Sequence, residues 1–198
     1  MSLPRALLAA SRPENWWSAK IPPLLAVGYA GLLIGGAGAA AGLVRLLALI
    51  LAICAVAAFG HAINDAFDIP EDARRGKPNA MAHWPPAGRA LVCLLLAAAA
   101  FVPLVAVRAS AGAIALIAGN LALPAVYSWP PIRLKERGWW GVLADAGGAH
   151  LLPTLLIAGA FAPPGWRGTA FVLAAAGWAF AAGLRGILAH QVQDRDAD

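Results

Sequence analysis

Six apolar segments of about 20 residues each constrain the fold of this chain more than any other feature of its sequence. Short stretches in which charged residues, prolines and glycines gather separate them. A helix rises about 1.5 Å per residue, so about 20 residues cross a hydrocarbon core of about 30 Å. Lipid offers the backbone no hydrogen bonds, so each crossing segment should be helical. The pattern predicts an all-α, multi-span transmembrane bundle of six helices, at residues 17–36, 42–63, 89–108, 110–129, 140–162 and 168–189.

The composition agrees with a membrane protein. Hydrophobic residues make up 61% of the chain and charged residues 13%, against about 25% charged residues in an ordinary soluble domain. The first apolar segment is longer than a signal-peptide core and lacks a small-residue cleavage site, so we expect it to be retained. We therefore expect a single integral membrane domain spanning residues 1–198.

The distribution of cations predicts an orientation. With the N-terminus inside, twelve of the 15 lysines and arginines fall on cytoplasmic segments, and only Arg45, Arg108 and Arg167 fall outside. Such a bias is typical of cytoplasmic loops. The net charge of +5 is thus read as a topology signal, with no nucleic-acid partner expected.

A polar stretch at residues 61–79 interrupts this apolar pattern. Asn64, Asp68 and Asp72 are spaced four residues apart, so on a helix they lie along one face, drifting by about 40° at each step. Oxygen ligands of this kind suit a hard divalent cation, and Mg²⁺ usually completes its shell with substrate phosphates. Arg74 and Lys77 follow closely and could hold the remaining phosphate oxygens. The competing interpretation is a solvated acidic loop.

Pro70 lies inside this stretch and bears on the role of Asp72. A proline in a helix interior removes a hydrogen bond and clashes with the carbonyl four residues earlier. We therefore expect the helix to kink or end near residues 66–69, with Asp72 reaching the metal from a loop.

Several motifs, taken in order, resemble those of the UbiA family of intramembrane prenyltransferases. Asn64-Asp65-x-x-Asp68-x-x-x-Asp72, continuing into Gly76-Lys77-Pro78-Asn79, resembles the first aspartate-rich motif of that family. Tyr127-Ser128, a proline turn and Arg133-Leu134-Lys135 resemble its loop between helices four and five. Asp194 and Asp198, with His190 four residues earlier, resemble its second aspartate motif, and residues 11–23 resemble its entry into the first helix.

The resemblance implies a magnesium-dependent transfer of a prenyl group from a prenyl diphosphate to a lipid-soluble acceptor, for which an aromatic compound is expected. The active site would then face the cytoplasm. The implied metal ligands are Asn64, Asp68, Asp72, Asp194 and Asp198, of which the four aspartates would also be catalytic. The implied diphosphate-binding residues are Arg74, Lys77, Tyr127, Arg133 and Lys135.

The chain matches only part of the family pattern, because members typically have nine membrane helices and this sequence resembles the first six. The domain is therefore expected to be incomplete at its C-terminal end. Two alternatives remain open: an inactive fragment or assembly partner of such an enzyme, and a membrane transporter with an acidic ion path. A CDP-alcohol phosphotransferase is less favoured, since its Asp-Gly and Ala-Arg signature is missing from the acidic stretch.

Two ionisable residues, Asp145 and His150, fall inside the fifth predicted span. Placing an aspartate at the centre of a membrane helix costs about 2.5 kcal/mol or more, so such residues are functional candidates by default. The alternative is that Asp145 lines the mouth of the bundle. The roles of both residues, and that of His190, stay open at this point.

Overall fold

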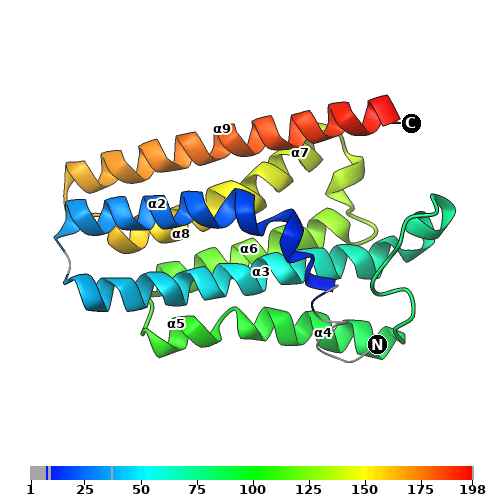
Figure 1. Cartoon of the computed structure of the whole chain (residues 1–198), viewed down its shortest axis with the longest axis horizontal. Helices are drawn as coiled ribbons and strands as arrows, with labels where there is room; N and C mark the ends of the chain where they lie inside the picture. The colour runs from blue at the N-terminus through cyan, green and yellow to red at the C-terminus, as the bar shows by residue number, and fades with distance from the viewer. Residues whose placement is uncertain (1–7, 9, 37, 198) are drawn as a thin grey trace.

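A computed structural model of the chain describes residue 8, residues 10–36 and residues 38–197, and over these it is an all-α bundle without a strand (Figure 1). The long helices are α2 (Trp17–Gly35), α3 (Ala39–Arg74), α6 (Ala111–Ser128) and α9 (Trp166–Ala197). Shorter helices are α4 (Pro86–Ala99), α5 (Val102–Ala106), α7 (Trp139–Ala146) and α8 (Leu152–Phe161). Two 3₁₀ turns, η1 (Pro13–Asn15) and η2 (Leu134–Glu136), and a π turn, η3 (Gly147–Leu151), complete the described elements.

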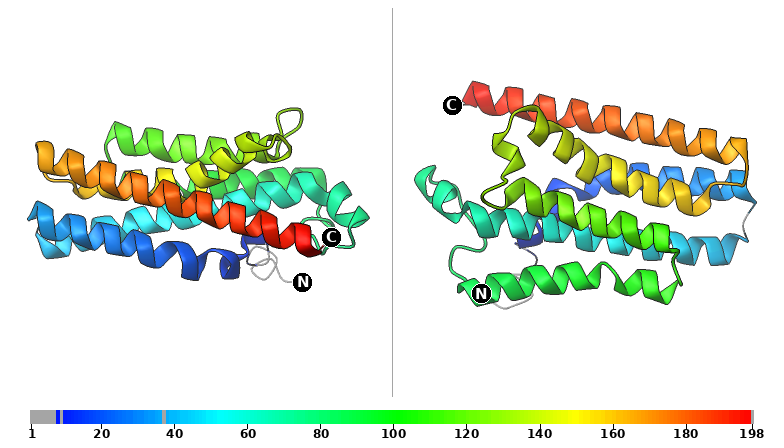
Figure 2. Two further views of the ribbon diagram at one scale, coloured as in Figure 1. Left: turned by 90° about the horizontal axis from the view of Figure 1, so that it is seen from above. Right: turned by 180° about the vertical axis from the view of Figure 1, so that it is seen from behind.

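Six helical stretches among the described residues are long and apolar enough to cross a membrane, which confirms the predicted number. Two of them are composite: α4 joins α5 over Pro86–Ala106, and α7, η3 and α8 together cover Trp139–Phe161. Large apolar side chains such as Leu94, Val105 and Leu173 lie exposed on the outer faces, as a bilayer environment requires. Figure 2 shows α9 and the α4–α5 pair on opposite sides of the bundle, with α3 and α6 between them.

Helix α3 is longer than the segment 42–63 expected from the sequence. Its 36 residues correspond to about 54 Å, well beyond a hydrocarbon core of about 30 Å. Apart from Arg45 near its start, the charged residues of α3 lie in its C-terminal part, and that part extends past the apolar core. This extension positions the candidate site.

The expectation that the helix ends near residues 66–69 and leaves Asp72 on a loop is wrong, because α3 continues to Arg74 and Asp72 is helical; a kink at Pro70 stays a prediction. Asn79 Nδ2 donates to the backbone oxygen of Asp65 at 2.8 Å, beside Ala66, whose carbonyl is the one that Pro70 leaves without its helical partner. Prolines are tolerated inside membrane helices, and α3 remains helical through Pro70.

The interior packs α3 against α6 and α8 through fully buried side chains such as Leu49, Ile117 and Ile157. At the polar end, α7 packs closely on η2. A Cβ atom added at Gly141 would lie 2.8 Å from the Leu134 oxygen and 3.0 Å from the Lys135 Cα. Only glycine allows this approach, which fixes the position of Lys135.

The π turn η3 separates α7 from α8 and contains His150. Single π turns inside α-helices occur frequently at functional sites. Nothing in the sequence pattern predicted it.

Candidate functional site

The candidate site forms where the C-terminal part of α3 meets the connection between α6 and α7. Asp68, which is buried, receives the ammonium group of Lys135 at both of its carboxylate oxygens. The same ammonium donates to Asn64 Oδ1 at 3.0 Å, and Ser128 Oγ donates to that oxygen at 3.1 Å. Residues more than 60 positions apart in the sequence therefore share one cationic centre.

Arg133 adds a second cation to this group. Its Nη2 lies 3.4 Å from Asp68 Oδ1 and 3.1 Å from Glu71 Oε2, and its Nε donates to Glu136 Oε1 at 2.6 Å. Burial opposes the charge of Arg133, but the hydrogen bond to Glu136 and the charges of Glu136, Asp68 and Glu71 outweigh it and raise the pKa of Arg133. The guanidinium therefore stays charged at any physiological pH.

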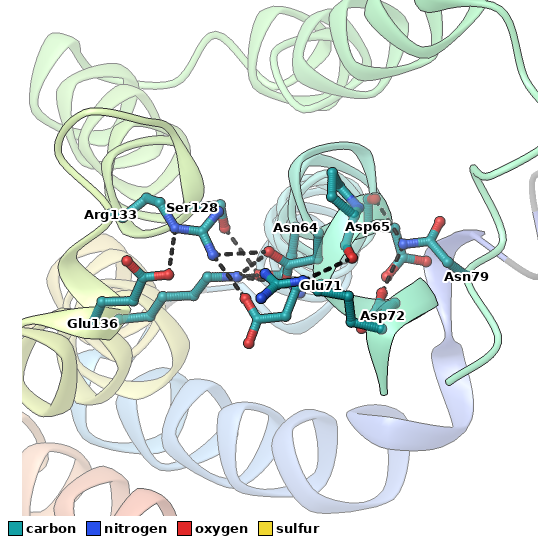
Figure 3. A network of polar contacts seen from close by, with 12 residues as sticks. Asn64, Asp65, Glu71, Asp72, Asn79, Ser128, Arg133 and Glu136 are labelled. Atoms are coloured by element: carbon teal, nitrogen blue, oxygen red, sulfur yellow. Dashed lines mark hydrogen bonds and ion pairs between the residues drawn. The ribbon is translucent and has the colours of Figure 1, made fainter. Parts of the chain in front are cut away.

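Figure 3 shows Arg133, Ser128 and Glu136 on one side of α3, while Asp72 and Asn79 face each other on the other side. We call the residues Asn64, Asp68, Glu71, Ser128, Arg133, Lys135 and Glu136 the polar network. It contains three carboxylates and two cations.

A second group lies on the adjacent face of α3. Asp65, which is only 2% exposed, pairs with Arg12 Nη2 at 2.9 Å. Asn79 Nδ2 donates to Asp72 Oδ2 at 2.7 Å, and Asn79 Oδ1 accepts from the backbone N–H of Met81 at 2.9 Å. Asn79 thus holds the connection after α3 against the helix, and it occupies one oxygen of Asp72.

The structure brings together four of the residues expected from the sequence: Asn64, Asp68, Arg133 and Lys135. It does not join Asp72 to them, since that carboxylate accepts a hydrogen bond from Asn79. The reason is that successive positions four apart drift around the helix, and Asn79 returns on the side of Asp72.

Three expected diphosphate-binding residues lie outside these contacts. Tyr127 is half-buried and within electrostatic range of Asp68 and Asp145. Arg74 and Lys77 are exposed, and Arg74 Nε donates to the Pro70 oxygen at 3.3 Å. Their roles remain predictions.

The second aspartate motif falls at the end of α9. Asp194 is in the helix, where only its backbone is described, and Asp198 lies outside the described residues. The C-terminal end of α9 reaches the same end of the bundle as the C-terminal end of α3 (Figure 1). The metal-binding roles of Asp194 and Asp198 also remain predictions.

A set of ionisable groups occupies the membrane-spanning region beside the polar network. Asp145 of α7 interacts electrostatically with Lys20 of α2, His150 of η3 and His190 of α9, and Lys20 also interacts with His61 of α3. Asp145 thus has partners on three different elements, which offsets part of the cost of its position in the membrane.

Sequence reasoning missed several members of these groups. Glu71 lies one helical turn after Asp68, and Glu136 lies three residues after Arg133, so spacing could have indicated both. For Asp65 the signal was the expectation that a carboxylate at the end of an apolar helix needs a cation, which Arg12 supplies. Asn79 was named only as the end of the first family-like motif, and no spacing indicated its contacts with Asp65 and Asp72.

The donor atoms of the polar network fit a hard cation in part. Asn64 Oδ1 and the Asp68 carboxylate converge on one positive centre, the Lys135 ammonium, and both are the oxygen ligands that Mg²⁺ prefers. Among the described side chains, no three His, Cys, Asp or Glu residues are grouped closely enough to hold a metal ion. Two ligands from α3 would therefore need completion by substrate oxygens, water or further residues.

Comparison with known proteins gives no match: no family model, no curated protein and no solved structure is significantly similar to the chain. The function must therefore be argued from the network itself.

Proposed function

We propose that this chain binds a prenyl diphosphate together with Mg²⁺ and transfers the prenyl group to a lipid-soluble acceptor inside the membrane. The observation that supports the proposal best is the contact of Asn64 and Asp68 with Lys135. It combines the ligand types needed for Mg²⁺ with a cation suited to a diphosphate, at the end of an apolar bundle.

In this proposal, the ion pairs of the polar network exchange partners when the substrate binds. Lys135 and Arg133 would turn from Asp68 to diphosphate oxygens, to which they donate charge-assisted hydrogen bonds. Asn64 and Asp68 would then be available to hold Mg²⁺. Without substrate, the cations Lys135 and Arg133 neutralise the Asp68 carboxylate, which lowers the cost of burying these charges.

Bound Mg²⁺ would supply Lewis-acid stabilisation of charge on the diphosphate. In the transfer, the bond between prenyl C1 and the diphosphate oxygen breaks, and its electron pair leaves with the diphosphate. The acceptor forms a bond to C1 and loses a proton, which a carboxylate of the site can accept. Arg133 and Lys135 hold the departing diphosphate, and the isoprenoid tail lies among apolar side chains of the bundle.

The remaining assignments rest on the family resemblance. They give Asp72, Asp194 and Asp198 to the metal and Arg74, Lys77 and Tyr127 to the diphosphate. The orientation of this face toward the cytoplasm rests on the distribution of cations in the sequence.

The test is thermal unfolding of the detergent-purified chain with geranylgeranyl diphosphate, with and without Mg²⁺. We expect stabilisation only when both are present, amounting to about 2.7 kcal/mol at a ligand concentration of 100 times Kd. Asp68→Asn and Lys135→Gln should each abolish the stabilisation. Glu14→Gln is the matched control, since Glu14 is exposed and outside the polar network.

Two outcomes would contradict the proposal in different ways. Stabilisation by Mg²⁺ alone that the diphosphate lipid does not increase would favour a transporter with an acidic ion path. No Mg²⁺-dependent effect at all would favour an inactive fragment or an assembly partner. The low burial of α9 bears on the assembly partner. Only 11% of its most apolar stretch lies inside the bundle, the lowest share of the six spans, so its outer face is open to lipid or to another helix.

A further inference from the structure

A cavity of about 530 Å³ lies between α3, α6 and α8 at the end of the bundle opposite the polar network. Its wall is mostly apolar and includes Leu49, Leu116 and Leu155, and its rim includes Ser110 at the start of α6. The volume lies within the range of about 300–1,000 Å³ typical of small-molecule sites. The cavity plays no part in the proposed prenyl transfer.

Arg45 is the one charged residue that lines this cavity. Its guanidinium carbon lies 6.0 Å from the centre of the Phe161 ring, and its Nε is buried without a hydrogen-bond partner among the described residues. An arginine that merely reached out to the aqueous phase would leave its donors solvated. A buried, unpaired donor on a charged group costs about 1–3 kcal/mol or more, so the Nε of the half-buried Arg45 lacks an acceptor that a ligand could supply.

None of the ion pairs among the described residues involves Arg45. All ten aspartates and glutamates fall at position 14, at 65–72, at 136 and 145, or at 194–198, and none lies within 18 residues of Arg45 in the sequence. The acidic residues on α3 itself begin 20 residues after Arg45, about 30 Å along the helix. Arg45 therefore has no counter-charge among the described side chains, and a bound anion could supply one.

The position of Arg45 indicates where that counter-charge resides. Arg45 and Asp68 lie on the same helix, 23 residues and therefore about 35 Å apart, slightly more than the hydrocarbon thickness of about 30 Å. When the polar network lies at one boundary of the bilayer, Arg45 lies at the other, at the level of lipid headgroups. An arginine at that level can donate charge-assisted hydrogen bonds to a lipid phosphate.

We propose that the cavity binds an anionic phospholipid of the opposite leaflet. The phosphate pairs with Arg45 near the start of α6, where the helix dipole also favours negative charge. One acyl chain lies along Leu49, Leu116 and Leu155 toward the middle of the bundle. The site is independent of the proposed prenyl transfer, because no residue is shared between the two.

The test is a lipid titration of the delipidated chain, followed by native mass spectrometry, with phosphatidylglycerol, phosphatidylcholine and inorganic phosphate as separate probes. We expect phosphatidylglycerol to bind best, and Arg45→Gln to weaken its binding about tenfold or more. Arg167→Gln is the matched control, since it removes an exposed cation at the same end. Gly159→Leu should block the cavity, because Gly159 lines it and nothing lies within 4 Å of a Cβ at that position. Gly177→Leu on α9 is the control, since a Cβ there also meets nothing within 4 Å but Gly177 does not line the cavity.

Each of three results would overturn the proposal. Equal phosphatidylglycerol binding by the Arg45→Gln and Arg167→Gln variants would remove Arg45 as the anchor. Equal binding of phosphatidylcholine and phosphatidylglycerol would mean that the net charge of the headgroup does not determine which lipid binds. Displacement of the lipid by inorganic phosphate, together with unchanged binding in Gly159→Leu, would leave a simple anion site without a place for the acyl chain.

Discussion

The ion pair between Lys135 and Asp68 gives the sharpest prediction for stability. Both side chains are largely buried, at 15% and 11% exposed. In Lys135→Met, the Asp68 carboxylate would keep only Arg133, at 3.4 Å, and that guanidinium is already shared with Glu71 and Glu136. The variant therefore leaves a buried charge with one distant partner.

The magnitude follows from this geometry. Breaking a buried pair by removing one partner costs about 3–5 kcal/mol. Arg133 and the residual exposure reduce the cost, so we expect Lys135→Met to lower the free energy of unfolding by about 2–3 kcal/mol. In the double variant Asp68→Asn/Lys135→Met the unpaired charge disappears. The double variant should then be more stable than Lys135→Met alone, by about 1–2 kcal/mol.

The assay is reversible unfolding in mixed detergent micelles, followed by far-UV circular dichroism and tryptophan fluorescence. Arg75→Met serves as the comparison, since its pair with Glu71 is four residues apart and 58% exposed on the arginine side. Such a surface pair is worth about 0.3–0.5 kcal/mol. A double variant less stable than Lys135→Met, or equal costs for Lys135→Met and Arg75→Met, would refute the buried-pair reasoning.

Two further substitutions test the supports of the site. Arg12→Gln leaves the buried Asp65 without its cation and should destabilise the chain by about 3 kcal/mol in the same unfolding assay; a loss below about 0.5 kcal/mol would show that the pair does not form in solution. Gly141→Ala places a Cβ 3.0 Å from the Lys135 Cα and should weaken Mg²⁺-dependent binding of the prenyl diphosphate, whereas Gly186→Ala, with nothing within 4 Å, should not; equal binding by both variants would contradict the close packing.

The membrane helices were predictable because their signal is additive over many residues. Each apolar run of about 20 residues can form only one kind of structure in lipid, so the starts at Trp17 and Ala111 lie close to those expected. The end of α3 was not predictable in the same way. Asn79 returns from the following connection to the Asp65 oxygen and the Asp72 carboxylate, and tertiary hydrogen bonds of that kind leave no periodic pattern.

The candidate site was predictable in its residue types but not in its pairing. Four-residue spacing placed Asn64 and Asp68 on one face, and the contacts of both with Lys135 agree with that. The spacing could not reveal that a lysine 67 positions later would neutralise Asp68. The path of the connection through Arg133 sets the distance between the lysine and the carboxylate, and that path is not visible in the spacing. The same limit explains why Asp72 was grouped with residues that it does not contact.

The π turn at Gly147–Leu151 makes the fifth span sensitive to the number of its residues. Relative to an uninterrupted α-helix, a single π turn holds about one additional residue, and one residue corresponds to a rotation of about 100° about the axis. The π turn takes up that residue, whereas a residue deleted elsewhere in the span, in regular α-helix, would turn α7 relative to α8 and swing the packing surface of Gly141 away from Lys135. An insertion or deletion far from any charged side chain of the polar network would in this way change its geometry as surely as a substitution within it.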